Sequence, residues 1–146
     1  MEEFTLGMGA VGVRIYDATF DAFGQREEAF THAALRAVTS YIESREDDQK
    51  NEITDLLLDQ QNILENDSPE ELFERKVIID RPTRFWIEMI ARQNGGDPPE
   101  SVLTTGVFLL SVMLEIVKRN PHASLYTFPT VTLIKQIIDG KPQLYN

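Results

Sequence analysis

Two histidines and a set of acidic side chains are the residues with which this chain could do metal chemistry. Glu28 and His32 are four residues apart, so on a helix they share one face and offer one carboxylate and one imidazole. No second Glu/His pair completes such a site, and His122 follows a proline in a predicted loop. Because a protein metal centre needs three or four ligands, we expect no metal here and predict that His32 faces solvent or caps a helix.

The remaining acidic residues are explained by local structure. The run at 46–48 (Glu-Asp-Asp) lacks the ligand spacing and central glycine of a calcium loop. Glu71 fits a capping box opened by Ser68, and Glu74 fits surface charge better than a role as its catalytic partner. The chain has no cysteine, which excludes a cysteine nucleophile and thiolate metal ligands. We therefore predict that the protein is not an enzyme and uses no cofactor, with a small enzyme as a remote alternative.

Three glycines match the spacing of a nucleotide-binding turn. Gly7, Gly9 and Gly12 fit G-x-G-x-x-G, a motif that needs a full strand before it and a helix opening at the third glycine. Only a short apolar stretch precedes Gly7, and residues 11–16 have strand character. We expect residues 1–24 to form an N-terminal arm or short strands rather than a nucleotide site.

The hydrophobic pattern predicts most of the elements. Residues 25–43 and 47–65 carry apolar side chains at three- and four-residue steps, which predicts two helices, and the short connection makes them an antiparallel hairpin. A strand at 76–80 is followed by a helix at 84–93 that Thr83 caps. Residues 130–139 fit a short helix or a strand, and both interpretations stay open.

The segment 98–119 is the predicted centre of the fold. No charged residue lies between Glu100 and Glu115, and apolar side chains occupy every face, so this helix must be covered by other elements or by a second copy. Its apolar stretch Val102–Val117 is too short to span a bilayer, which needs about 20 predominantly apolar residues. The predicted fold class is mostly α, with one or two short strands and four parts: the arm 1–24, an acidic helical hairpin 25–73, a strand-helix-helix module 74–120 and an extension 121–146.

Residues 76–119 resemble one known family. The strand KVIID at 76–80, the helix TRFWIEMIARQ at 83–93, the turn NGGD at 94–97 and the helix PPESVLTTGVFLLSVMLEIVKR at 98–119 follow in an order that resembles the ribbon-helix-helix family. The resemblance implies a two-fold homodimer in which the strands of two chains pair and the long helices pack together. The expected interface residues are Val77, Ile79, Val107, Leu110 and Leu114.

The same resemblance implies DNA binding by the paired strands, with contacts from Lys76, Arg81 and Arg84. The sequence departs from the family pattern in two ways. The outward row of the strand includes Asp80, and the long helix begins with two prolines that have no N–H for a phosphate. A net charge of −10 also opposes an approach to DNA.

The acidic excess lies mainly in residues 1–73, whereas the remainder of the chain is close to neutral. We therefore predict a non-enzymatic regulatory or adaptor protein that acts as a homodimer, with a protein partner contacted by the acidic hairpin through Asp55 and Asp59. The alternative is a ribbon-helix-helix transcriptional regulator. Because the N-terminus lacks the basic region of a signal peptide, we expect a cytoplasmic protein without a membrane segment.

Overall fold

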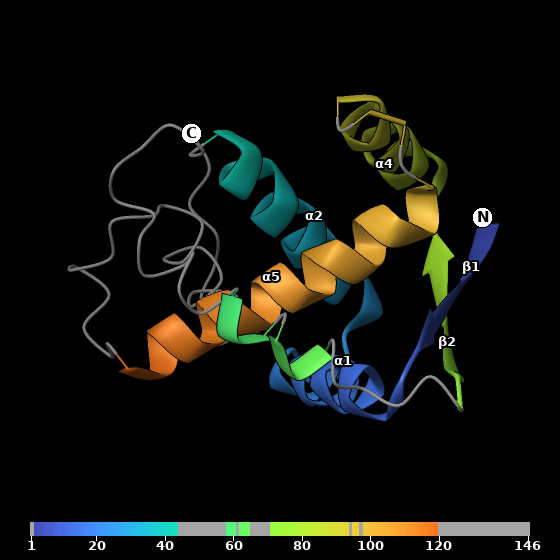
Figure 1. Ribbon diagram of the computed structural model, residues 1–146. Helices are drawn as coiled ribbons and strands as arrows, with labels where there is room; N and C mark the ends of the chain where they lie inside the picture. Colours follow the sequence, from blue (N-terminus) through green and yellow to red (C-terminus); the bar gives the residue numbers. More distant parts are fainter. Residues whose placement is uncertain are drawn as a thin grey trace.

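The computed structural model describes residues 2–43, 58–60, 62–64, 71–93, 95–96 and 98–119. Its elements are β1 (Glu2–Met8), α1 (Ala10–Ala22), α2 (Glu27–Glu43), β2 (Phe73–Ile79), α4 (Arg81–Gln93) and α5 (Pro99–Arg119), and residues 58–60 and 62–64 are also helical (Figure 1). The described part is mostly helical, with one two-stranded antiparallel sheet. This confirms the predicted mostly-α class with one or two short strands.

The two strands belong to the same chain. β1 pairs antiparallel with β2, with Glu2 opposite Ile79 and Met8 opposite Phe73. Alternate side chains, such as Leu6 and Val77, turn into the core at 1% and 2% exposure. The prediction of a lone strand at 76–80 was therefore wrong, because the strand begins at Phe73 and β1 of the same chain satisfies its backbone groups.

Residues 11–16, which were expected to be strand-like, are part of α1. The helix is capped by Gly9, and the Val13 N–H donates to the Gly9 carbonyl at 2.9 Å. Val13, Tyr16 and Thr19 recur every three residues and are all buried. Burial of this one face outweighs the weak helix propensity of the β-branched residues, so tertiary packing overrides the local preference.

The three spaced glycines lie at the junction of β1 and α1. A Cβ at Gly12 would lie 3.2 Å from the Met8 Cβ and 3.6 Å from the Phe108 ring, so glycine here permits close packing of the helix. β1 pairs with an antiparallel neighbour and not with the parallel strand of a dinucleotide-binding βαβ unit. The motif is therefore explained by packing.

α5 crosses the molecule (Figure 1), and most of its described apolar side chains are buried against other elements of the same chain. It contacts α1, α2, α4 and β1. The five residues that were predicted to form a dimer interface are at most 8% exposed and belong to this core: Val77, Ile79, Val107, Leu110 and Leu114. This part of the prediction is corrected, because side chains that are buried within one chain offer no surface to a second.

α4 begins three residues earlier than predicted. Asp80, directly after β2, is its cap: the Asp80 Oδ1 accepts the N–H of Thr83 at 2.9 Å. Thr83, the predicted cap, lies inside the first turn and is buried. Proline in a first turn is compatible with a helix because the N–H groups there have no helical acceptor, which is why Pro82 does not delay the start.

The described elements repeat as two strand-helix-helix halves. The strands are both 7 residues long and the first helices are both 13 residues long, and each strand is separated from its helix by one residue, Gly9 or Asp80. Adding 71 to the numbers of β1 and α1 gives those of β2 and α4. The central pair of the ladder, Thr5 opposite Lys76, joins two positions related by that shift. The two strands are therefore related by an approximate two-fold axis through this pair, and a helix of the same length follows each of them.

The second helices also have corresponding positions at their crossing point. Ala34 is the eighth residue of α2, counted from Glu27. Gly106 is likewise the eighth residue of α5, counted from Pro99. α2 and α5 cross where these two residues meet, because a Cβ at Gly106 would lie 2.7 Å from the Ala34 carbonyl oxygen. α2 and α5 therefore cross at corresponding positions of the two halves.

Several predictions lie outside the described residues. They include the first part of the helix 47–65, the acidic run 46–48, His122 and the open segment 130–139. The parts of 47–65 that are described, 58–60 and 62–64, are helical as predicted. In the part of the chain that the structure describes, no helix combines the length and the hydropathy that a membrane span requires.

Candidate functional site

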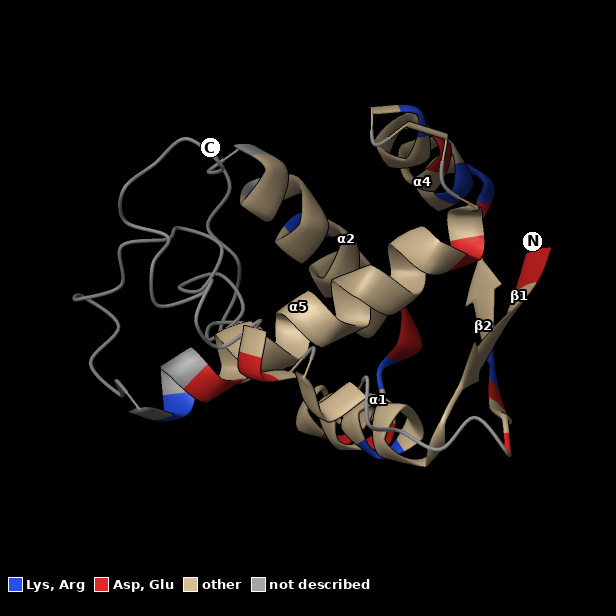
Figure 2. Cartoon of the chain, viewed as in Figure 1, with Lys and Arg blue, Asp and Glu red and all other residues tan. Residues whose placement is uncertain are grey.

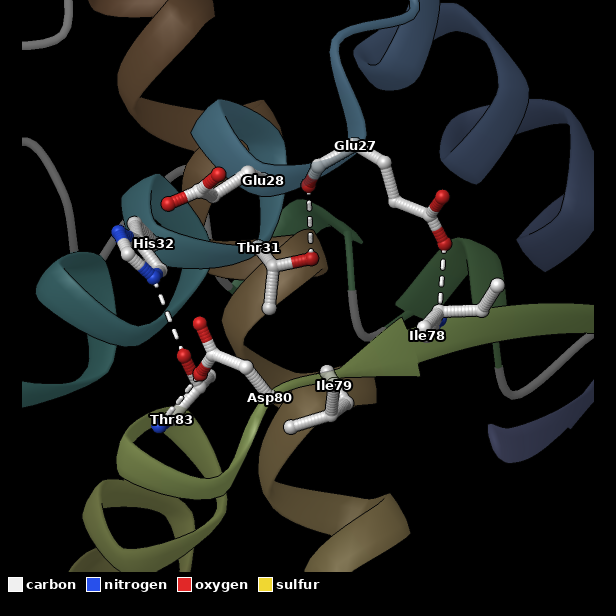
Figure 3. Close-up of a pocket in the computed structure, with 8 residues that line it drawn as sticks. All are labelled: Glu27, Glu28, Thr31, His32, Ile78, Ile79, Asp80 and Thr83. Carbon is white, nitrogen blue, oxygen red and sulfur yellow. Dashed lines mark hydrogen bonds between the residues drawn. The ribbon is translucent and has the colours of Figure 1, made fainter. Parts of the chain in front are cut away.

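His32 lies in a small polar cleft between α2 and the junction of β2 with α4 (Figure 3). The cleft has a volume of about 280 Å³. Its walls hold three carboxylates, two threonines and the imidazole, together with two isoleucines: Glu27, Glu28, Asp80, Thr31, Thr83, His32, Ile78 and Ile79. The predicted Glu28–His32 pair is therefore on one face of α2, as its spacing requires.

The polar groups of this cleft bond to one another. The His32 Nε2 lies 3.1 Å from the Thr83 Oγ1, and the hydrogen bonds from the Thr83 side chain and N–H lower the pKa of Asp80. The Glu27 Oε1 accepts the N–H of Ile78 at 2.8 Å, on the edge of β2 away from β1. These contacts fasten α2 to the second half of the chain, which gives the cleft a structural role.

Among the described residues, no group of three or more His, Cys, Asp or Glu side chains is placed to hold a metal ion. Glu28 and His32 alone supply two ligands, fewer than a protein metal site uses. His32 instead packs edge-on against Trp86, with ring centroids 6.1 Å apart.

The outer face of the two-stranded ribbon is the surface that would meet DNA in a ribbon-helix-helix protein. Its exposed residues are two acids, one cation and three uncharged residues: Glu3, Glu74, Lys76, Thr5, Gly7 and Ile78. The Lys76 Nζ lies 3.7 Å from a Glu3 carboxylate oxygen, which offsets the single positive charge. The face therefore has no net positive charge for phosphates.

The other two predicted DNA contacts are separated in the structure. The Arg84 guanidinium forms ion pairs with Glu2 and Glu88 and lies 5.9 Å from the ring centroid of Phe4, so its charge is committed within the molecule. Arg81 is exposed at the start of α4, away from the centre of the ribbon. Lys76, Arg81 and Arg84 do not form one basic surface.

The starts of the second helices are poor phosphate anchors. α2 has Glu27 and Glu28 in its first turn. α5 begins at Pro99, preceded by Pro98 and followed by Glu100. A helix N-terminus attracts anions through free N–H groups, and these acidic or proline-containing turns remove that attraction in both halves.

Ion pairs connect the two halves. Arg75 in β2 donates to both carboxylate oxygens of Asp17 in α1, at 2.9 and 2.8 Å, and these bonds hold the pKa of Asp17 below its usual value. Burial raises the pKa of the neighbouring Tyr16 to about 12. Arg84 and Glu2 join α4 to β1 in the same way, so each ion pair links a first helix to the strand of the other half.

The outer face of α4 has the features of a contact surface. Phe85 and Met89 are one helical turn apart and are 60% and 58% exposed. Phe85 lines a cavity of about 630 Å³ whose other walls are three acids, two arginines and an isoleucine: Glu2, Asp80, Glu88, Arg81, Arg84 and Ile79. The basic residues of α4 are Arg81, Arg84 and Arg92, which are among the blue positions of this helix in Figure 2, in a chain that is acidic overall.

Sequence reasoning assigned Phe85 and Met89 to a helix but did not recognise them as a surface. The signal was present: the buried face of α4 consists of Thr83, Ile87, Ile90 and Ala91. Phe85 and Met89 lie on a different side at their own four-residue spacing. A helix with apolar residues on two faces is the pattern that would have indicated the site.

Of the two predicted partner-binding residues, Asp59 is exposed within 58–60, and Asp55 lies outside the described residues. The structure does not bring Asp59 to the cleft of His32 or to the cavity beside α4, because Asp59 lines neither of them.

Comparison with protein families, with curated proteins and with solved structures found no match to this chain.

Proposed function

We propose that this chain is a non-enzymatic regulatory protein that acts by binding another protein, on a scaffold similar to a ribbon-helix-helix dimer contained in one chain. The order of elements and the approximate two-fold axis through Thr5 and Lys76 support the scaffold. In that family, two chains supply the paired strands. Here β1 and β2 take those places, which joins the two copies of the motif covalently.

The observation that carries the choice of a protein partner is the chemistry of the exposed ribbon. Ile78 is 52% exposed on a face that also carries Glu3 and Glu74. Apolar and acidic groups on an outward face suit contact with a protein and repel a phosphate backbone. The acidic residues at the starts of α2 and α5 also repel a phosphate backbone.

The runner-up is a DNA-binding regulator, which the scaffold favours and the charges oppose. It is tested by selecting from a pool of random-sequence duplexes with the full-length protein at about 50 and about 200 mM salt. Since DNA binding depends on cations that displace counterions, we expect no enriched sequence and no salt-dependent retention. An enriched sequence whose binding is lost in Lys76→Ala would overturn the choice of a protein partner.

The homodimer that the sequence predicts is tested separately. The strand pairing and helix packing that suggested it take place inside one chain, so a dimer would need another surface. Sedimentation velocity at micromolar concentration measures this directly, and we expect a single-chain species. An adaptor role for the acidic segment around Asp59 is likewise proposed, and Asp59→Lys in a co-purification experiment tests it.

A further inference from the structure

α4 presents a narrow stripe with apolar residues between two cations. Arg81, Phe85, Met89 and Arg92 are all exposed. At about 100° per residue, their spacing of four, four and three places them within about 80° of the helix circumference. We call these four residues the α4 stripe. Since the opposite side of α4 packs against the core, the α4 stripe is a distinct surface.

The fold does not require large apolar residues on this stripe. In the first half, the positions related to Phe85 and Met89 by the shift of 71 are Arg14 and Ala18, and both are exposed on α1. The same place on the scaffold therefore carries a cation and a single methyl group in one half, and an aromatic ring and a thioether in the other. Two adjacent large apolar side chains that the architecture does not need indicate a binding surface.

The two arginines of the stripe differ from Arg84 in their surroundings. Within the described residues, the structure gives no ion pair or hydrogen bond to the side chain of Arg81 or Arg92, whereas Arg84 has two acidic partners. Glu88, the acid nearest the stripe on α4, is held by Arg84 at 3.0 Å. Two positive charges available to a partner thus flank Phe85 and Met89.

These features specify the chemistry of the partner. Arg81 and Arg92 are eleven residues apart, about 16 Å along the helix axis at about 1.5 Å per residue. A partner helix with acidic residues at a similar separation and apolar residues between them would match both the charges and the apolar centre. The adjoining cavity of about 630 Å³ has Glu2, Asp80 and Glu88 in its walls beside its arginines, so it gives room for one large uncharged side chain of that helix.

We propose that the α4 stripe docks an acidic amphipathic helix of a partner protein. A second copy of this chain that docked through the same stripe is a poorer occupant, because a two-fold contact would set the arginines of one copy against those of the other. A nucleic acid is also poorer, since the stripe offers two cations and two exposed apolar groups. The inference rests on the proposed function and adds to it the surface and the class of partner.

The test selects ligands without presupposing their charge. A phage-displayed library of helical peptides, each about 18 residues or five turns long, is randomised at its exposed positions and selected on the full-length protein. The recovered peptides are then measured by fluorescence anisotropy. We expect peptides with net negative charge and apolar residues on one face, whose affinity falls at least tenfold in Phe85→Gln and in Arg92→Gln.

The matched controls are Arg14→Gln, which removes one exposed arginine at the equivalent place on α1, and Ile78→Lys on the ribbon; neither should change the affinity. Failure to select any peptide, selection of neutral or basic peptides, or affinity that the α4 variants leave intact would overturn the proposal. Peptides that lose affinity only in Ile78→Lys would move the site to the ribbon and leave the proposed protein-binding function standing. Self-association that is lost in Phe85→Gln would assign the stripe to a second copy and overturn the proposed occupant.

Discussion

Gly106 of α5 lies against the backbone of Ala34 of α2, and a Cβ at position 106 would be 2.7 Å from the Ala34 carbonyl oxygen and 3.0 Å from its carbonyl carbon. The obstacle is backbone, which cannot rotate away as the end of a side chain can. The contact therefore fixes how closely the two longest helices approach. It is also the point at which the two halves of the chain cross.

Gly106→Ala is expected to destabilise the protein. Alanine favours a helix over glycine by about 1 kcal/mol, but forcing a methyl group into a packed crossing costs typically about 1–3 kcal/mol, and here the neighbour is immobile. Urea unfolding measures the difference. Gly7→Ala is the control, since a Cβ at Gly7 meets nothing within 4 Å. An unchanged or raised midpoint for Gly106→Ala would contradict the close crossing.

Leu6→Ala tests whether β1 is part of the core rather than an irregular arm. Leu6 is 1% exposed, and truncating a buried leucine costs about 2–5 kcal/mol through lost burial and the cavity that remains. Thr5→Ala, on the exposed side of the same strand, should stay within about 0.5 kcal/mol of the parent. Equal effects of the two substitutions in thermal unfolding would show that the strand does not alternate as described.

Asp17→Asn removes the charged partner of Arg75. The hydrogen bonds from Arg75 lower the pKa of Asp17 in the folded state, so its contribution is present above the unfolded value of about 3.9 and is lost as the pH falls through the lower folded value. Because the two side chains are 47% and 37% exposed, we expect a loss of less than about 1 kcal/mol at pH 7.

Urea unfolding of Asp17→Asn at neutral pH and at a pH of about 2.5 measures this loss, and we expect the difference from the parent to shrink at the lower pH. Asp21→Asn on the same helix is the control. A difference that is as large in acid as at neutral pH would mean that Asp17 stabilises the fold by other means.

Tyr16→Phe is expected to change the stability in alkali. Burial raises the pKa of Tyr16 from 10.0 to about 12, so the unfolded chain releases the phenol proton before the folded protein does. The stabilising effect of the neutral phenol is complete below about pH 10 and is lost as the pH rises through about 12. Between these values the parent should lose more stability, relative to neutral pH, than Tyr16→Phe. Parallel curves for the parent and Tyr16→Phe would refute the assignment.

The sequence predicted the elements whose signals are local. The apolar steps of α2 and the uncharged stretch of α5 predicted both helices, and α5 is central as expected. The pairing of β1 with β2 could not be predicted in this way, because nothing in residues 73–79 says whether a strand pairs with its own chain or with another. The need for a cover over α5 was inferred correctly, but pattern alone does not identify which segment provides it.

The candidate site was predictable only in part. Glu28 and His32 were placed on one face of a helix by their spacing, whereas the contacts of His32 with Thr83 and Trp86 come from residues that are distant in the sequence. The exposure of Phe85 and Met89 depends on which side of α4 meets the core, and that is decided by the long-range packing of Ile87 and Ile90.

Covalent union of the two halves has a consequence for stoichiometry. A symmetric dimer of identical chains displays every surface twice and tends to recruit its ligand in pairs or to straddle a palindromic target. In this chain the counterpart of Phe85 is Arg14, so each molecule offers a single copy of that apolar surface. The surface residues of the two halves can therefore change independently. One half can specialise in binding a partner while the other half maintains the fold.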